Sequence, residues 1–190
     1  MLLVLTFAAG CLALSGCSNQ VSDAATLAQK GDVSDACVAY QQILKDQPHN
    51  REALDGAAVC LFELKRYDEA LVLEERLASL DPKDAQIRVE LGFNYLNHQS
   101  RPADAEKALG EAAKLDPSAK NLCFLSQAEV ATWNFSSAEK SLRQAITTQP
   151  DYSYSYELLS RLLKDQGRIW EAEQVIQQAA SLGVNITQTS

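Results

Sequence analysis

Cysteine and histidine side chains are the first candidates for chemistry in this chain, because both can act as nucleophiles and as metal ligands. The chain has five cysteines and two histidines in 190 residues. The three cysteines of the main body, Cys37, Cys60 and Cys123, lack the spacing of a metal site. His49 and His98 fall in separate predicted turns and have no cysteine partner. The sequence therefore predicts no metal site.

Motifs typical of enzymes are also missing from the sequence. There is no glycine-rich loop that could cradle a phosphate, and no recognisable set of serine, histidine and aspartate. Acidic residues are spread as on a solvated helix surface, as in Asp68, Glu69, Glu74 and Glu75. We therefore predict no catalytic residue and no cofactor, and an enzyme is the least favoured class of function.

The charge of the chain limits its partners. The formal net charge is −8, whereas binding to phosphate backbones requires clustered lysine and arginine. The same charge argues against electrostatic attachment to anionic lipid. We expect a protein partner and no nucleic acid.

A repeat positions the remaining residues. Alanine recurs at positions 36, 70, 105, 138 and 172, with spacings of 34, 35, 33 and 34. Proline follows each of the first four alanines by twelve residues, at Pro48, Pro82, Pro117 and Pro150. A period this constant indicates an array of similar units, each too small to hold a core alone. Such arrays offer extended binding surfaces.

One unit, residues 51–84, illustrates the internal pattern. Two apolar runs with helical spacing, over about 54–64 and 67–80, are separated by two basic residues. Pro82 ends the second run, because proline cannot continue a helix and restricts the residue before it. Each unit is therefore predicted to be helix, tight turn, helix. The recurrent alanine lets the helices approach closely.

This pattern resembles the tetratricopeptide repeat. The match is best in residues 85–119, at Leu91, Gly92, Tyr95, Ala105, Leu109, Ala112 and Pro117. The resemblance implies an all-α fold, a right-handed superhelical solenoid of about five helix-turn-helix units. The units span about 20–50, 51–84, 85–119, 120–152 and 153–184, so the repeat domain covers 20–184 and leaves a tail at 185–190.

The N-terminal segment differs in composition from the repeats. Residues 2–14 are uncharged and apolar, too short for a bilayer span and typical of a signal peptide. The sequence Leu14-Ser15-Gly16-Cys17 follows, and it resembles a bacterial lipobox. The resemblance implies a signal peptide at 1–16, a lipid on Cys17 and a short tether at 17–22. An ordinary signal peptide is the alternative, and Ala8-Ala9-Gly10-Cys11 is a weaker second lipobox.

Two interpretations remain open for Cys37 and Cys60. Free cysteines are often small buried apolar residues. Cys37 is expected early on the second helix of unit one, and Cys60 late on the first helix of unit two. Antiparallel packing of those helices would bring the two together, and export would permit a disulfide.

The resemblance also places a binding groove along the first helices. The implied groove residues are Val59, Phe62, Val89, Phe93, Leu96, Phe124, Gln127, Val130, Tyr154 and Arg161. The middle of this groove is apolar and its C-terminal end is charged, which favours an apolar peptide or an amphipathic helix. Phe93 and Phe124 could instead be core residues. Trp133 and Trp170 are expected to cover helix ends.

Short lipoproteins built from these repeats resemble accessory factors of pilus and secretion machines, such as the Tad/Flp pilus lipoprotein and type IV pilus pilotins. The resemblance implies a scaffold, lipid-anchored to the bacterial cell envelope, at the outer membrane in a Gram-negative cell. It would help a machine component to localise or assemble. The alternative is an adaptor that presents a periplasmic protease or cell-wall hydrolase to its substrate.

Overall fold

The structure is a computed structural model, which describes residues 9–98 and 100–186, with side chains from Asn19 onward. The described residues form ten α-helices and no strand. The predicted all-α class is therefore confirmed. The chain divides into two compact units, Met1–Pro82 and Lys83–Ser190.

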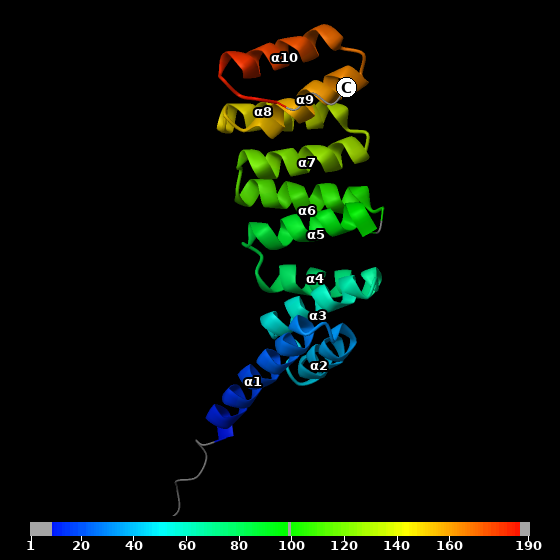
Figure 1. The fold of residues 1–190 in the computed structure, drawn as a ribbon, viewed down its shortest axis with the longest axis vertical. Helices are drawn as coiled ribbons and strands as arrows, with labels where there is room; N and C mark the ends of the chain where they lie inside the picture. Colours follow the sequence, from blue (N-terminus) through cyan, green and yellow to red (C-terminus); the bar gives the residue numbers. More distant parts are fainter. Residues whose placement is uncertain (1–8, 99, 187–190) are drawn as a thin grey trace, which may run out of the picture. The chain divides into compact units, whose positions relative to one another are not determined.

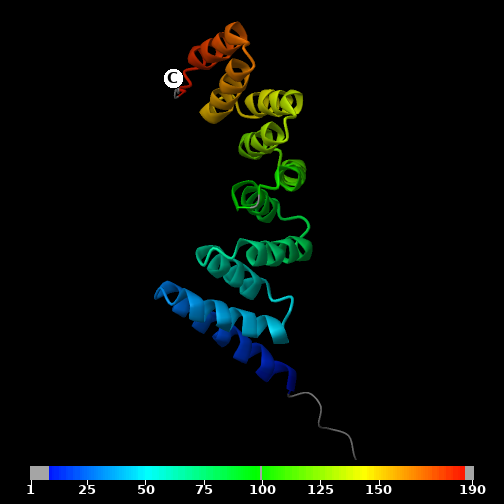
Figure 2. The same ribbon diagram turned by 90° about the vertical axis from the view of Figure 1, so that its right-hand side faces the viewer.

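The first unit contains two helix pairs. Its helices are α1 (Ala9–Gln29), α2 (Val33–Asp46), α3 (Arg51–Glu63) and α4 (Tyr67–Leu80). Helix α1 packs against α2, α2 against α3, and α3 against α4 (Figure 2). The core of this unit forms around Cys37, Tyr40, Cys60 and Leu61, each at most 5 % exposed.

The second unit contains three further pairs, stacked in chain order (Figure 1). Its helices are α5 (Ala85–His98), α6 (Pro102–Leu115), α7 (Ala119–Ala131), α8 (Phe135–Thr148), α9 (Ser153–Asp165) and α10 (Ile169–Ser181). The first helices of successive pairs also contact one another, α5 with α7 and α7 with α9. They therefore form a continuous surface of this unit, which we call the first-helix face.

The periodic residues have the positions that the sequence predicts. All five repeat alanines are fully buried, at 0 % exposure: Ala36, Ala70, Ala105, Ala138 and Ala172. Each repeat proline lies two residues beyond the end of a second helix, so α2, α4, α6 and α8 all end where predicted. The alanine and proline period thus specifies both the packing contact and the length of each pair.

The turn inside each repeat needs one residue with positive φ. These residues recur with the same period, with φ of 87° at Gly31, 59° at Lys65, 49° at Ser100, 63° at Trp133 and 74° at Gly167. Glycine adopts this conformation without steric cost, whereas a bulky side chain is an outlier there. Trp133 is the largest side chain among the five.

The N-terminal helix differs from its prediction. Helix α1 begins at Ala9, so residues 17–22, predicted as a tether, are helical in this structure. Residues 1–8 of the predicted signal peptide and residues 187–190 of the predicted tail lie outside the described residues. No helix in the described part of the chain is long and apolar enough to cross a membrane.

Candidate functional site

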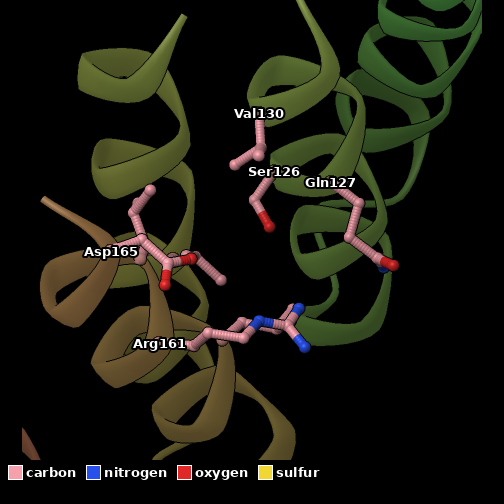
Figure 3. Close-up of a pocket in the computed structure, with 8 residues that line it drawn as sticks. Ser126, Gln127, Val130, Arg161 and Asp165 are labelled. Atoms are coloured by element: carbon pink, nitrogen blue, oxygen red, sulfur yellow. The ribbon is translucent and has the colours of Figure 1, made fainter. Parts of the chain in front are cut away.

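A pocket on the first-helix face is the candidate site. It has a volume of about 250 Å³ and lies between α7 and α9, with Leu142 of α8 also in its wall. Figure 3 shows Ser126 and Val130 on α7 beside the space, and Arg161 extending from α9 toward the α7 side. The lining residues are Ser126, Gln127, Val130, Leu142, Leu158, Arg161, Leu162 and Asp165. We call this cavity the α7–α9 pocket.

Small polar residues allow α7 and α9 to form the pocket wall. Where the best-matching unit has Gly92 on its first helix, the next two have Ser126 and Ser160. Both are buried, and each hydroxyl donates to the carbonyl three residues earlier, Ser126 to Cys123 O at 2.7 Å and Ser160 to Glu157 O at 3.1 Å. Their hydrogen-bonding capacity is thus met within their own helices.

Buried polar contacts hold the base of α9 in place. Tyr156 is fully buried, and its hydroxyl donates to Pro150 O at 3.0 Å. The Cys123 sulfur on α7 lies 3.3 Å from the Ser155 hydroxyl on α9. Burial raises the pKa of the Cys123 thiol to about 11, so it is protonated at neutral pH and is not a nucleophile there. These contacts fix the start of α9 against α7 and the preceding turn.

The mouth of the pocket is polar and its wall is apolar. Among the residues that the structure describes, neither Arg161 nor Asp165 forms an ion pair. The Gln127 amide donates only a long bond, 3.4 Å, to Cys123 O. These groups can bind a ligand without breaking an internal pair. The arrangement suits an apolar side chain inside and a polypeptide backbone or a charge at the mouth.

An aromatic pair joins α5 and α7, two helices of the first-helix face. The Phe93 and Phe124 rings meet edge to face, with centroids 4.5 Å apart. Lys120 Nζ lies 5.7 Å from the centroid of Phe124. Both phenylalanines are half-buried, so each contributes to packing between α5 and α7 and also offers ring surface to solvent. The core interpretation thus holds in part for both rings, and their place in a binding groove stays a prediction.

The other predicted groove residues have varied positions. Val89 is buried, at 4 % exposure, so its assignment to the groove surface is wrong, because its side chain packs into the core. Leu96 and Tyr154 are half-buried, and the Tyr154 ring lies 6.3 Å from that of Tyr152. In the first unit, Val59 is 52 % exposed and Phe62 is half-buried. A groove that continues from the first unit to the second stays a prediction.

Cys37 and Cys60, both in the first unit, are free, buried thiols in the structure. Cys37 and Cys60 share one core cluster, which agrees with the predicted packing of α2 against α3. Burial raises the pKa of both thiols, and the neighbouring Cys37 raises that of Cys60 further. The disulfide is not formed here, and both residues act as small buried apolar groups. The side chain of Cys17 lies outside the described residues.

The exposure of the two tryptophans differs from the prediction. Trp133 is 81 % exposed and Trp170 is 71 % exposed, so neither covers a helix end as expected. Trp133 makes only an edge contact to Phe135, with ring centroids 5.8 Å apart. Their exposure depends on which neighbours surround the turn, and the sequence pattern does not contain that information.

Among the described residues, no three potential ligand side chains gather in a way that could hold a metal ion.

Comparison with known proteins supports the repeat assignment. A family model described as the tetratricopeptide repeat matches residues 27–92. No curated protein sequence matches the chain. Among solved structures, a crystal structure of MamA protein is 18 % identical, with a TM-score of 0.74, over 92 % of this chain and 98 % of that one.

Two further solved structures have the same fold. MamA from Desulfovibrio magneticus RS-1 is 14 % identical, with a TM-score of 0.72 over 88 % of this chain and 94 % of that one. YrrB, described as a tetratricopeptide protein with an unusual peptide-binding site, is 14 % identical, with a TM-score of 0.69 over 85 % of this chain and 84 % of that one. Residues 27–92 therefore match the tetratricopeptide repeat model, and the described residues share the helix-pair fold of these solved structures.

Proposed function

We propose that this chain is a scaffold that binds a protein partner through the first-helix face, with the α7–α9 pocket as the anchoring site. The observation that carries the proposal is the pocket itself, which joins an apolar wall to charged groups that lack internal partners. An enzyme site would require reactive groups, whereas the Cys123 thiol beneath the pocket is buried and protonated at neutral pH. The geometry serves binding.

The pocket favours a short polypeptide segment. Val130, Leu158 and Leu162 offer an apolar wall to one side chain of such a segment. Arg161 can donate to a carbonyl or carboxylate, and Asp165 can accept from a backbone N–H. The aromatic pair of Phe93 on α5 and Phe124 on α7 belongs to the same first-helix face and offers ring surface to a second apolar side chain. This is recognition of an apolar peptide or of one face of an amphipathic helix.

The likeness to YrrB supports this proposal, since that protein of the same fold has a peptide-binding site. We expect Phe93→Ala to weaken partner capture from solubilised membranes by about 30-fold, because a buried aromatic anchor contributes about 2 kcal/mol to binding. Arg161→Ala should weaken capture as well, and Lys83→Ala is the control. Capture by folded Phe93→Ala and Arg161→Ala variants at wild-type strength would refute the proposal.

We also propose that a lipid on Cys17 attaches the scaffold to the bacterial cell envelope. The support is the sequence Leu14-Ser15-Gly16-Cys17. Cys17→Ser should abolish lipidation and move the protein from the membrane fraction to a soluble fraction. A variant that remains membrane-bound, together with no acyl mass on the native protein, would contradict the lipid anchor.

The cellular role that we propose is assembly or localisation of a pilus or secretion machine. Its support is the combination of a lipobox with an array that consists of repeats alone. A secretin or pilin component should be recovered with the wild-type protein after cross-linking in membranes, and it should be lost with Phe93→Ala. Recovery of a protease or cell-wall hydrolase in its place would favour the adaptor function.

A further inference from the structure

A second cavity lies against another face of helix α7. It has a volume of about 530 Å³ and is bordered by α6, α7 and α8. We call it the α6–α8 pocket. Its lining residues are Glu106, Gly110, Ala113, Lys114, Pro117, Leu122, Leu125, Glu129, Ser137, Lys140, Ser141 and Gln144. It shares no lining residue with the α7–α9 pocket.

Glu129 is the unusual side chain of this pocket. It is only 7 % exposed, yet its Oε2 atom is buried and has no hydrogen-bond partner in the part of the chain that the structure describes. Buried carboxylates are normally paired or fully hydrogen-bonded, because loss of hydration is unfavourable for a charge. The Ser141 hydroxyl donates one hydrogen bond to this carboxyl group. One acceptor oxygen on the wall of a cavity is left without a donor.

The charges around Glu129 do not supply that donor. Burial is the main reason that the pKa of Glu129 is raised, and the negative charge of Glu106 on α6 raises it further, whereas the hydrogen bond with Ser141 and the positive charge of Lys140 lower it by less. Glu106 is itself held by a hydrogen bond from the Thr132 hydroxyl. Lys114 and Lys140 also line the pocket, but both are exposed, and neither forms an ion pair with Glu129 in the described structure. Two carboxyl groups from neighbouring helices therefore border the cavity, and the two exposed lysines on its rim leave Glu129 Oε2 without a donor among the described residues.

The rest of the pocket wall is apolar, and a glycine widens it. Leu122, Leu125 and Ala113 provide apolar surface beside the carboxyl groups. Gly110 lies inside α6 without a positive φ, and a Cβ atom there would meet only Leu125 Cδ1, at 3.8 Å. Alanine would therefore fit and would favour the helix. Glycine keeps that volume open to the pocket.

The geometry points to a second binding site: the α6–α8 pocket accepts the ammonium or guanidinium group of a lysine or arginine side chain from a protein partner. The cationic head would donate to Glu129 Oε2 and interact with Glu106, in charge-assisted hydrogen bonds. The alkyl stem would lie along the leucines, as the stems of these side chains do on apolar surfaces. This inference does not depend on the α7–α9 pocket.

The test uses the full chain and two capped tripeptides that differ in charge alone. Acetyl-Gly-Lys-Gly-amide carries the ammonium group, and the norleucine peptide has a similar stem without it. NMR titration should show saturable shifts of α6–α8 pocket residues with the lysine peptide. The norleucine peptide should bind with an affinity at least about tenfold lower. Binding should also weaken on acidification, because a protonated Glu129 carries no charge.

Two variants separate this site from general surface binding. Glu129→Gln keeps the shape of the side chain and should abolish the preference for lysine over norleucine. Gly110→Ala should fold with an unchanged or higher melting temperature, yet bind the lysine peptide more weakly. Equal binding of both peptides, no binding of either, or an unchanged preference in folded Glu129→Gln would overturn the inference.

Further arms identify the source of the cation and separate the two sites. Spermidine tests a free polyamine, and binding of spermidine without binding of the lysine peptide would overturn the assignment to a protein side chain. Arg161→Ala should leave the lysine-peptide shifts intact, because Arg161 does not line this pocket. Failure of the α7–α9 proposal would thus appear in partner capture, and failure of this inference would appear in the lysine-peptide titration.

Discussion

Two glutamates of the fourth repeat lie in opposite electrostatic settings. Glu139 on α8 accepts hydrogen bonds from Arg168 and from Arg143, the latter at 2.7 Å. The bond from Arg168 is the main reason that the pKa of Glu139 is lowered. Glu129 on α7 has one oxygen without a partner, and its burial raises its pKa. The two residues are ten positions apart in sequence, yet the ionised form of Glu139 is stabilised and that of Glu129 is destabilised by burial.

The difference indicates what each charge does. Arg168 also pairs with Glu171 at 2.6 Å, so the charge of Glu139 joins α8 to the start of α10 and stabilises the stacking of two repeats. The charge of Glu129 contributes nothing comparable to the fold. A buried group that lowers stability and borders a cavity is a candidate for binding. The following predictions test this contrast, from the largest expected effect to the smallest.

Removal of the apolar wall beside Glu129 should have the largest effect. Leu122 is 4 % exposed and belongs to the core of the second unit. Leu122→Ala should lower the free energy of unfolding by about 2–5 kcal/mol, because it deletes buried methyl groups and leaves a cavity. It should also admit water toward Glu129 and return its pKa toward the ordinary value. Urea denaturation and an NMR titration of the carboxyl group measure the two effects, and an unperturbed stability would remove Leu122 from the core.

Glu139→Gln should lower stability at neutral pH by about 1–2 kcal/mol, because charge-assisted hydrogen bonds weaken and the site is partly exposed to solvent. The pKa of Glu139 is lowered in the folded state, from an ordinary value of 4.5. Its stabilisation is therefore present above that value and is lost as pH falls through the folded pKa. The difference between wild type and variant, measured by urea denaturation over a pH series, should shrink in acid.

Glu129→Gln should raise the free energy of unfolding at neutral pH, whereas Glu139→Gln lowers it. The pKa of Glu129 is raised in the folded state, so the wild type loses stability as pH rises from about 4.5 through the folded pKa. The variant should gain on the order of 1 kcal/mol at neutral pH, since it removes a buried unpaired charge, and this gain should vanish below about pH 4.5. A loss of stability at neutral pH would show that the carboxylate is satisfied.

Arg161→Gln should leave stability almost unchanged. Arg161 is exposed at the mouth of the α7–α9 pocket and forms no ion pair within the described residues. We expect a change within about 0.5 kcal/mol, although partner binding weakens. Thermal denaturation is the check. A large loss of stability would show that Arg161 holds the fold together, as Arg168 does.

The fold was largely predictable because its signal is repeated. Five alanines in register predict five buried helix contacts, and prolines mark four helix ends. The start of α1 was not predictable in the same way. Residues 9–19 precede the first repeat pattern, so the period does not reach them.

The candidate site was predictable only in part. Register on the first helices identified Gln127, Val130 and Arg161, and the structure brings these three together in one pocket. Register does not distinguish depth, so Val89 was taken for a surface residue although it is buried. Glu129 was missed because burial comes from α6 and α8 packing beside it, whereas its local sequence is that of any helix surface. Trp133 was expected to cover a helix end and is exposed instead, because exposure at a turn depends on the elements around it.

Photo-cross-linking in living cells tests the central claim most directly. A photoreactive phenylalanine analogue at Val130, which is 39 % exposed on the α7–α9 pocket, should form an adduct with one partner protein. The adduct should be lost when Arg161→Ala is added. The same analogue at Val72, which is 54 % exposed on α4, is the control and should form no such adduct. An adduct at Val72 but not at Val130, or an adduct at Val130 that persists with Arg161→Ala, would contradict the assignment of the binding surface.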